Sequence, residues 1–228
     1  MANTPPPTSS NSSFNPVEPE IYPGTNTFVN LLNIEDTSKL LKAEASLTNM
    51  RSLELLQQPE IIPQTFDVGH LQNIHQHLFQ DIFEWAGCFR AYDVKKGEDI
   101  FTPADKLEEM SSQVFTEIIT DGCFHGVADP DELANKSARY LGRINALHPF
   151  PEGNGRAQRI FLSHLFKKTP YDLRWDLVPK WEMILVCQNV HRLPPEERFD
   201  SMEWMMRKIM VNEAEKQGKS GVPTAPQQ

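Results

Sequence analysis

Residues 148–159, HPFPEGNGRAQR, decide the fold, because this polar stretch joins the end of one apolar helix to the start of the next. It combines an imidazole, a carboxylate, a glycine-rich turn and two guanidinium groups: His148, Glu152, Gly153, Asn154, Gly155, Arg156 and Arg159. A proton acceptor beside an anion-binding turn and positive charges is what the transfer of a phosphate-containing group requires. The stretch therefore predicts an active site between two helices.

The Gly-Asn-Gly turn is predicted to bind phosphate. A helix that begins near Asn154 or Gly155 presents unpaired N–H groups and the positive end of its dipole to the turn. Glycine lacks a Cβ, so the backbone amides can approach phosphate oxygens closely. Arg156 and Arg159 are three residues apart and share a helix face, where both can bind one anion. Two positive charges held so close indicate a polyanionic ligand.

Glu152 and His148 complete the predicted chemistry. A carboxylate directly before a phosphate-binding turn predicts a bridging Mg²⁺, which prefers hard oxygen ligands. The ordinary pKa of histidine is about 6.5, so near neutral pH His148 can accept a proton from a hydroxyl group. Each of these residues taken singly is more often structural, whereas the ordered set favours a functional site.

Helices are predicted on both sides of this stretch. Asp129 and Pro130 provide a cap and a first turn, and apolar residues then recur at helical spacing as far as Leu147. Pro149 ends that helix. Residues 160–166 are apolar around much of a helix circumference, which predicts a buried central helix.

Other helices are predicted as scaffold. One begins at the Asp36/Thr37 cap and ends near Pro59, with Leu40, Leu47 and Met50 toward the core, and nothing in it indicates chemistry. Further helices are predicted from Asp67 through Phe83, from Pro103 through Ile118, near residues 179–190 and near residues 195–212.

Residues 87–102 break the helical pattern. Lys96-Gly97-Glu98-Asp99 lies between extended runs at residues 91–94 and 100–102, and Gly97 allows a positive φ, so a β-hairpin is predicted. A plain surface turn with solvated charges is the alternative. The expected fold class is therefore all-α, a helical bundle with one inserted β-hairpin flap.

Composition bounds the remaining possibilities. The chain has 228 residues with 39% hydrophobic and 23% charged residues, which suits one globular domain over residues 21–212. Residues 1–20 and 213–228 are expected to be a disordered Pro/Ser-rich tail and a flexible C-terminal tail. A net charge of -9 argues against nucleic acid or anionic membrane as a direct partner. Three scattered cysteines and no signal-peptide pattern predict a cytoplasmic protein.

The central stretch closely resembles the signature of the Fic domain family, HPFx(D/E)GNGRxxR, and it matches every fixed position. The preceding helix, the apolar helix from Ile160 and the segment FQDIFEWAG at residues 79–87 also resemble the Fic core. The resemblance covers roughly residues 21–210.

This resemblance implies the all-α Fic fold and a protein adenylyltransferase, which transfers AMP from ATP to a Tyr, Thr or Ser hydroxyl of a target protein and releases pyrophosphate. The implied cofactors are ATP and Mg²⁺. The implied roles are a base at His148, a magnesium ligand at Glu152, an anion hole at Gly153, Asn154 and Gly155, and phosphate contacts from Arg156 and Arg159.

The predicted hairpin resembles the flap of the family, which pairs with an extended segment of the target by strand addition. Its expected target-docking residues are Val94, Lys95, Ile100 and Phe101, and its expected nucleotide contacts are Lys96 and Gly97. Glycines at positions 153 and 155 favour adenylylation over phosphotransfer. A phosphotransferase, a de-AMPylase and a non-enzymatic interaction module are the alternative functions.

Many relatives in this family are inhibited by a helix bearing (S/T)xxxE(G/N), and this motif is absent from the chain. A separate small antitoxin is therefore the expected inhibitor, with an inhibitory segment that this sequence does not contain as the alternative, and the chain is expected to act as a toxin or an effector. A type II topoisomerase subunit and a GTPase are the expected kinds of target. Secretion into a host cell by a route independent of a signal peptide is the alternative to a cytoplasmic location.

Overall fold

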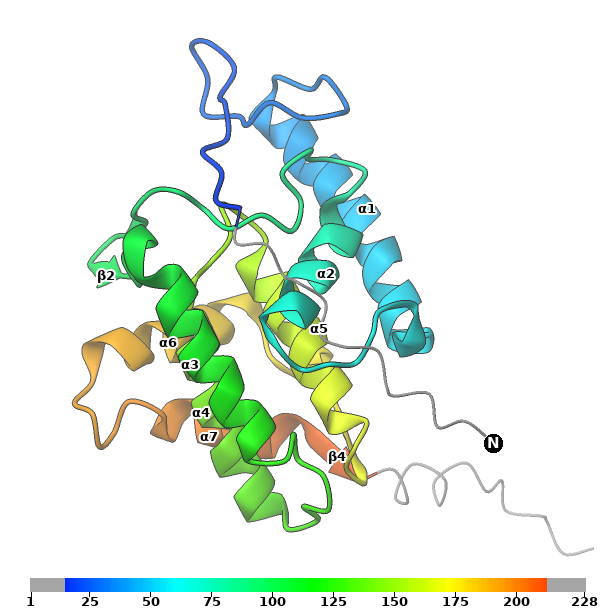
Figure 1. Ribbon diagram of the computed structural model, residues 1–228, viewed down its shortest axis with the longest axis vertical. Helices are drawn as coiled ribbons and strands as arrows, with labels where there is room; N and C mark the ends of the chain where they lie inside the picture. The colour runs from blue at the N-terminus through cyan, green and yellow to red at the C-terminus, as the bar shows by residue number, and fades with distance from the viewer. Residues whose placement is uncertain (1–14, 213–228) are drawn as a thin grey trace, which may run out of the picture.

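The computed structural model describes residues 15–212, and most of this part of the chain is helical (Figure 1). The α-helices are α1 Thr37–Gln57, α2 Val68–Phe79, α3 Leu107–Thr120, α4 Pro130–Leu147, α5 Asn154–Phe166, α6 Lys180–Arg192 and α7 Asp200–Ile209. Short 3-10 helices lie at Pro59–Ile61, Ala104–Lys106 and Trp175–Leu177. The predicted tails lie largely outside the described residues, but the backbone of Val17 pairs with residues 89 and 91.

Aspartate caps fix the start of three helices, as the sequence predicted. The Asp36 carboxylate accepts a hydrogen bond from the Lys39 N–H at 2.8 Å, and Asp67 does the same for His70 at 2.8 Å. Asp129 caps α4, where Pro130 occupies the first turn. The predicted end of α2 is wrong, because the chain turns after Phe79 and the Ile82 N–H returns to the Phe79 carbonyl at 2.9 Å.

The central position predicted for the helix after the motif is confirmed. α5 lies in the middle of the bundle, with α1 and α2 on one side and α3 and α4 on the other (Figure 1). α6 and α7 contact α4. The apolar residues of α5 are at most 5% exposed: Ile160, Phe161, Leu162, Leu165 and Phe166. The polar turn that precedes α5 is therefore anchored on the best-buried element of the fold.

The hairpin forms, but its strands are shorter than predicted. β1 Lys95–Lys96 pairs with β2 Asp99–Ile100 in an antiparallel register. The expected extended runs on either side pair only next to the turn, where the Phe101 N–H donates to the Val94 carbonyl at 3.4 Å, because the buried Arg90 guanidinium takes the carbonyls farther from the turn. It donates to the Tyr92 carbonyl at 2.6 Å and to the Thr102 carbonyl at 2.5 Å. One side chain thus replaces the base of the strand ladder.

A second small sheet was not predicted. β3 Tyr171–Leu173 pairs with β4 Met210–Asn212, so the last helix ends at Ile209 and not at Asn212. Met50, expected in the core, is 47% exposed. Within residues 15–212, every helix is too short or too polar to span a lipid bilayer.

Candidate active site

His148 forms the C-cap of α4 in a left-handed conformation, with φ 45°, and its N–H bonds to the Ile144 carbonyl at 3.3 Å. The ring is only 8% exposed and stacks on Phe101, with 4.0 Å between ring centroids. Neither ring nitrogen has a hydrogen-bond partner within residues 15–212. Burial, with smaller effects from the nearby charges of Lys96 and Arg90, lowers the pKa of His148 to about 3. The imidazole is therefore neutral, and its one polar approach, to the backbone of Asn145, is too weak to offset the effect of burial on the pKa.

Asn154 holds the turn together. Its side-chain amide donates to the Phe150 carbonyl at 2.7 Å and its side-chain oxygen accepts from the Phe150 N–H at 2.9 Å. Because both ends of this buried amide are used, only the main chain of Asn154 is available to the predicted anion site. The side chain instead fixes the angle at which the loop enters α5.

Gly153 is required by both conformation and space. Its φ is 80°, and a Cβ at this position would lie 2.2 Å from the Phe79 ring. Gly155 differs, because the nearest atom to a Cβ there is Arg159 Nη1 at 3.6 Å, an ordinary contact. Phe79 therefore packs directly beneath the turn, and any side chain at residue 153 would push the two apart.

The two arginines have different surroundings. Arg156 donates to Glu44 Oε1 at 2.5 Å and to Thr48 Oγ1 at 3.2 Å, and its guanidinium lies 4.7 Å from the centroid of the Phe79 ring. Arg159 makes no side-chain hydrogen bond or ion pair within the described part of the chain. Its pKa is lowered by burial and then by the charge of Arg156. Arg159 is therefore an uncompensated cation beside the turn, ready for an anion.

Glu152 fits the role of a single magnesium ligand. Its side chain is 44% exposed, and Oε1 accepts from the Gly153 N–H at 2.9 Å. Residues 15–212 contain no cluster of three or more carboxylate, histidine or cysteine groups able to hold a metal alone. One protein carboxylate suits Mg²⁺ that takes its other ligands from phosphates and water.

His75 contributes to the site, although nothing in the sequence distinguished it. Its ring lies between Phe79 and Phe150, with centroid distances of 4.6 and 3.9 Å. Nδ1 accepts from the Gly87 N–H at 2.8 Å, and Nε2 therefore carries the proton and donates to the Glu152 carbonyl at 2.9 Å. His75 thus ties the loop before the hairpin to the loop before α5.

Glu44 also contributes to the site, contrary to the expectation that the first helix carries no chemistry. Leu40, Glu44 and Thr48 are four residues apart and lie on the buried face of α1, where Glu44 is 4% exposed. The signal that could have identified Glu44 is a carboxylate at the helical spacing of the buried residues of α1. Arg90, buried and bound to the His148 carbonyl at 2.8 Å, had no such signal.

The flap residues divide into exposed and buried groups. Lys95, Lys96 and Ile100 are exposed, with Ile100 at 69%, and space around Gly97 is open. The Phe101 side chain is instead buried against His148, so it covers the predicted base. Strand addition at the flap stays a prediction that depends on backbone groups.

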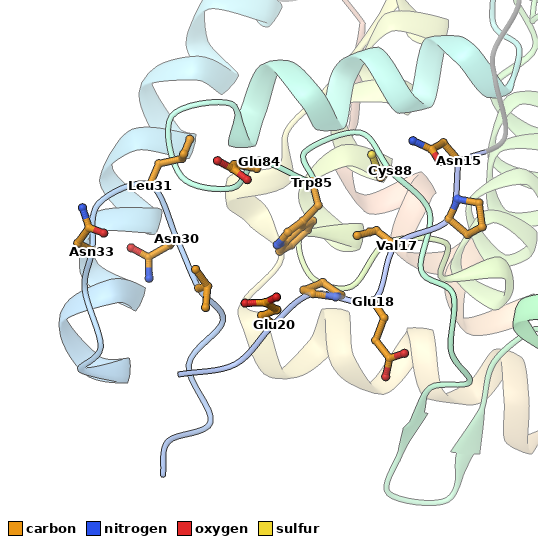
Figure 2. Close-up of a pocket in the computed structure, with 13 residues that line it drawn as sticks. Asn15, Val17, Glu18, Glu20, Asn30, Leu31, Asn33, Glu84, Trp85 and Cys88 are labelled. Atoms are coloured by element: carbon orange, nitrogen blue, oxygen red, sulfur yellow. The ribbon is translucent and has the colours of Figure 1, made fainter. Parts of the chain in front are cut away.

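The described residues also form a cavity of about 760 Å³ between segments 15–20, 29–33 and 84–88 (Figure 2). Trp85 lies against this cavity, and the carboxylates of Glu18, Glu20 and Glu84 lie around it (Figure 2). None of residues 148–159 lines it, so it is separate from the predicted site.

Comparisons with known proteins define the family. A family model described as Fic/DOC family matches residues 65–166. The chain is 35% identical over 166 residues to "Protein adenylyltransferase VbhT" of Bartonella schoenbuchensis, an alignment that covers 73% of this chain and 34% of VbhT. It is 34% identical over 161 residues to "Probable protein adenylyltransferase y4lH" of Sinorhizobium fredii, covering 70% of this chain and 81% of the relative. It is 32% identical over 163 residues to "Probable protein adenylyltransferase Fic" of Escherichia coli, covering 72% and 79%.

Solved structures support the same fold. The N-terminal Fic domain of a Bartonella effector protein superposes with a TM-score of 0.78 at 24% identity, covering 86% of this chain and 92% of that chain. BepC of Bartonella tribocorum, solved with bound AMPPNP, gives the same TM-score at 24% identity, covering 85% and 96%. The chain belongs to the Fic/DOC family. The predicted family, fold class and enzyme class, protein adenylyltransferase, are confirmed.

Proposed function

We propose that this protein transfers AMP from ATP to a Tyr, Thr or Ser hydroxyl of a target protein. The observation that carries the proposal is that three features meet at one turn: the His148 imidazole and the Arg159 guanidinium, both without a hydrogen-bond partner among residues 15–212, and the glycine-lined start of α5. Binding of AMPPNP by BepC and the names of the relatives support ATP as the substrate.

In the proposed reaction, the target hydroxyl oxygen forms a bond to the α phosphorus and the bond from that phosphorus to the β-phosphate oxygen breaks. His148 accepts the hydroxyl proton, and pyrophosphate leaves. The N–H groups at the start of α5 and the Arg159 guanidinium stabilise phosphate charge. Glu152 would hold Mg²⁺, which neutralises charge on the leaving group.

The flap would place the target. The outer edge of the hairpin at Lys95 and the exposed Ile100 suits backbone pairing with an extended segment, while Lys96 and Gly97 lie at the tip, where they are proposed to contact the nucleotide. Phe101 covers the His148 ring, so the target hydroxyl must displace this contact to reach the base.

We further propose that activity is controlled by a separate small antitoxin, because Arg159 has no intramolecular carboxylate partner within residues 15–212. A toxin directed at a cytoplasmic target such as a topoisomerase subunit follows from this control. The similarity to a Bartonella effector domain supports the second candidate, a secreted effector that acts on a GTPase.

Cell lysate, Mg²⁺ and ATP labelled on either the α or the γ phosphate test the reaction. The proposal predicts that one protein band takes up the α label only. His148→Ala should reduce this uptake by about 10²–10⁴-fold, the usual contribution of a positioned base. Uptake of the γ label would mean phosphotransfer and would contradict the proposed ATP orientation.

A further inference from the structure

The face of α1 that packs against the turn carries two acceptors for Arg156. Glu44 and Thr48 are one helical turn apart, and both accept hydrogen bonds from Arg156, at 2.5 and 3.2 Å. The Thr48 hydroxyl also donates to the main-chain carbonyl of Glu44 at 2.7 Å, which fixes its orientation. These two contacts join helices that are far apart in the sequence.

Arg156 is consequently held on three sides. Glu44 binds Nη2, Thr48 binds Nη1, and the Phe79 ring lies beneath the guanidinium at 4.7 Å from its centroid. Glu152 Oε1 lies farther from Nη2, at 3.5 Å. A guanidinium has five N–H groups, so these contacts leave donors that can bind a phosphate. The long Arg156 side chain is thereby fixed in one orientation before a ligand binds. Binding then loses less side-chain conformational entropy.

The ion pair also balances charge. Glu44 is 4% exposed, and its only ionic partner within the described residues is Arg156. A carboxylate buried to this degree is strongly disfavoured unless a cation faces it. Arg159, on the same face of α5 as Arg156, has no such partner among residues 15–212. The structure therefore separates one compensated arginine from one free arginine.

We infer that Glu44 and Thr48 are positioning residues that hold Arg156 in the orientation in which it binds the phosphates of ATP. This inference rests on the proposed function. Neither residue is proposed to touch ATP, and both act through the Arg156 guanidinium. α1 is thus part of the nucleotide site and not only scaffold.

Isothermal titration calorimetry with ATP and Mg²⁺ tests the inference without depending on transfer activity. Glu44→Ala should raise the Kd for ATP about tenfold, because a charged hydrogen bond is lost. Thr48→Val should raise it roughly threefold, because it removes a neutral hydrogen bond and leaves charge and shape unchanged. In an Arg156→Ala background both changes should have less than about a twofold effect, since the residue through which they act is gone.

Glu182→Ala is the matched control. Glu182 lies on α6, outside the predicted site, and its buried carboxylate is 7% exposed. It pairs with Lys208 of α7 at 2.8 Å. This variant should lose stability as Glu44→Ala does and keep the wild-type Kd. If Glu44→Ala does not fold, Thr48→Val decides alone.

Five results would overturn the inference. An unchanged Kd in Glu44→Ala would remove its positioning role, and a lower Kd would show that its carboxylate repels ATP. An unchanged Kd in Thr48→Val would remove the positioning role of Thr48. Full effects of both changes in the Arg156→Ala background would show that neither residue acts through Arg156. Absence of ATP binding by the wild-type protein would overturn the proposed function together with the inference.

Discussion

Gly153 shows how much a single residue determines at the site. Its positive φ turns the chain out of the loop and into α5, and the missing Cβ allows the Phe79 ring to pack against the backbone. The sequence predicted a glycine turn here, and close approach of the backbone to phosphate was the expected reason for both glycines. The structure separates them, because Gly155 has ordinary space around it and Gly153 does not.

Gly153→Ala should therefore destabilise the protein by about 2–4 kcal/mol. The alanine would have to adopt a left-handed conformation, and its Cβ would overlap the Phe79 ring. Gly24→Ala is the matched control, because Gly24 has a similar φ of 73° and nothing within 4 Å of an added Cβ. The control should lose only about 1 kcal/mol. Urea denaturation measures both, and equal losses would show that the Phe79 contact has no cost.

The same residue scale explains why Glu44 was missed. The first helix was predicted to be apolar scaffold, and Arg156, the partner of Glu44, lies 112 residues away in the sequence. Local pattern can show that a carboxylate faces the core, but it cannot show which cation meets it there. The motif residues were predictable because their spacing is local.

At the scale of elements, His75 couples α2 to two loops. Its ring accepts from the Gly87 N–H and donates to the Glu152 carbonyl, which lies directly before the turn. Aspartate caps predicted where α1, α2 and α4 begin, because a cap acts on its own helix. The links between elements, through His75 and Arg90, depend on residues distant in sequence and were not predictable.

His75→Phe should preserve the ring stack and remove both hydrogen bonds. Two backbone groups then lose their partners, and the expected loss is about 2–6 kcal/mol, since each buried unsatisfied group costs about 1–3 kcal/mol. Hydrogen exchange checks the cause directly, because the Gly87 amide should exchange faster than in the wild type. A Gly87 amide as protected as before would show that His75 does not hold this loop.

At the scale of the whole molecule, several histidines are buried and neutral. Burial lowers the pKa of His70 and of His75 to about 3, the same value as for His148. His70 Nδ1 accepts from the Phe66 N–H at 3.2 Å, and Nε2 lies 3.1 Å from His164 Nδ1. Protonation of His70 would place a proton on Nδ1, which faces the Phe66 N–H and has no acceptor there. Protonation therefore opposes folding.

Stability should therefore depend on pH. These groups have a lower pKa in the folded state than the usual value of about 6.5, so their contribution is complete above that pH and is lost as the pH falls toward 3. Each neutral histidine adds a slope of about 1.4 kcal/mol per pH unit between these limits. Urea denaturation from pH 7 to 5 should show this decline, and His70→Gln should reduce the slope by about one such contribution. An unchanged slope would contradict the neutral state of His70.

The helical bundle itself followed from apolar periodicity, and the buried α5 was predicted from it. The β3–β4 sheet was not, because it pairs two segments of three residues that are remote in sequence and too short to show a pattern. The hairpin was predicted at the correct turn but with wrong strand limits, because Arg90 takes the carbonyls that a ladder would use. Non-local contacts account for each difference.

In the proposed function, the turn before α5 orients ATP so that AMP is transferred. The most direct test is mass spectrometry of the modified side chain. The target band is recovered from lysate that was incubated with wild-type protein or with the His148→Ala variant. The expected product is a hydroxyl side chain that carries adenosine monophosphate with the wild type and an unmodified side chain with the variant. A side chain that carries only a phosphate group would contradict the proposed function.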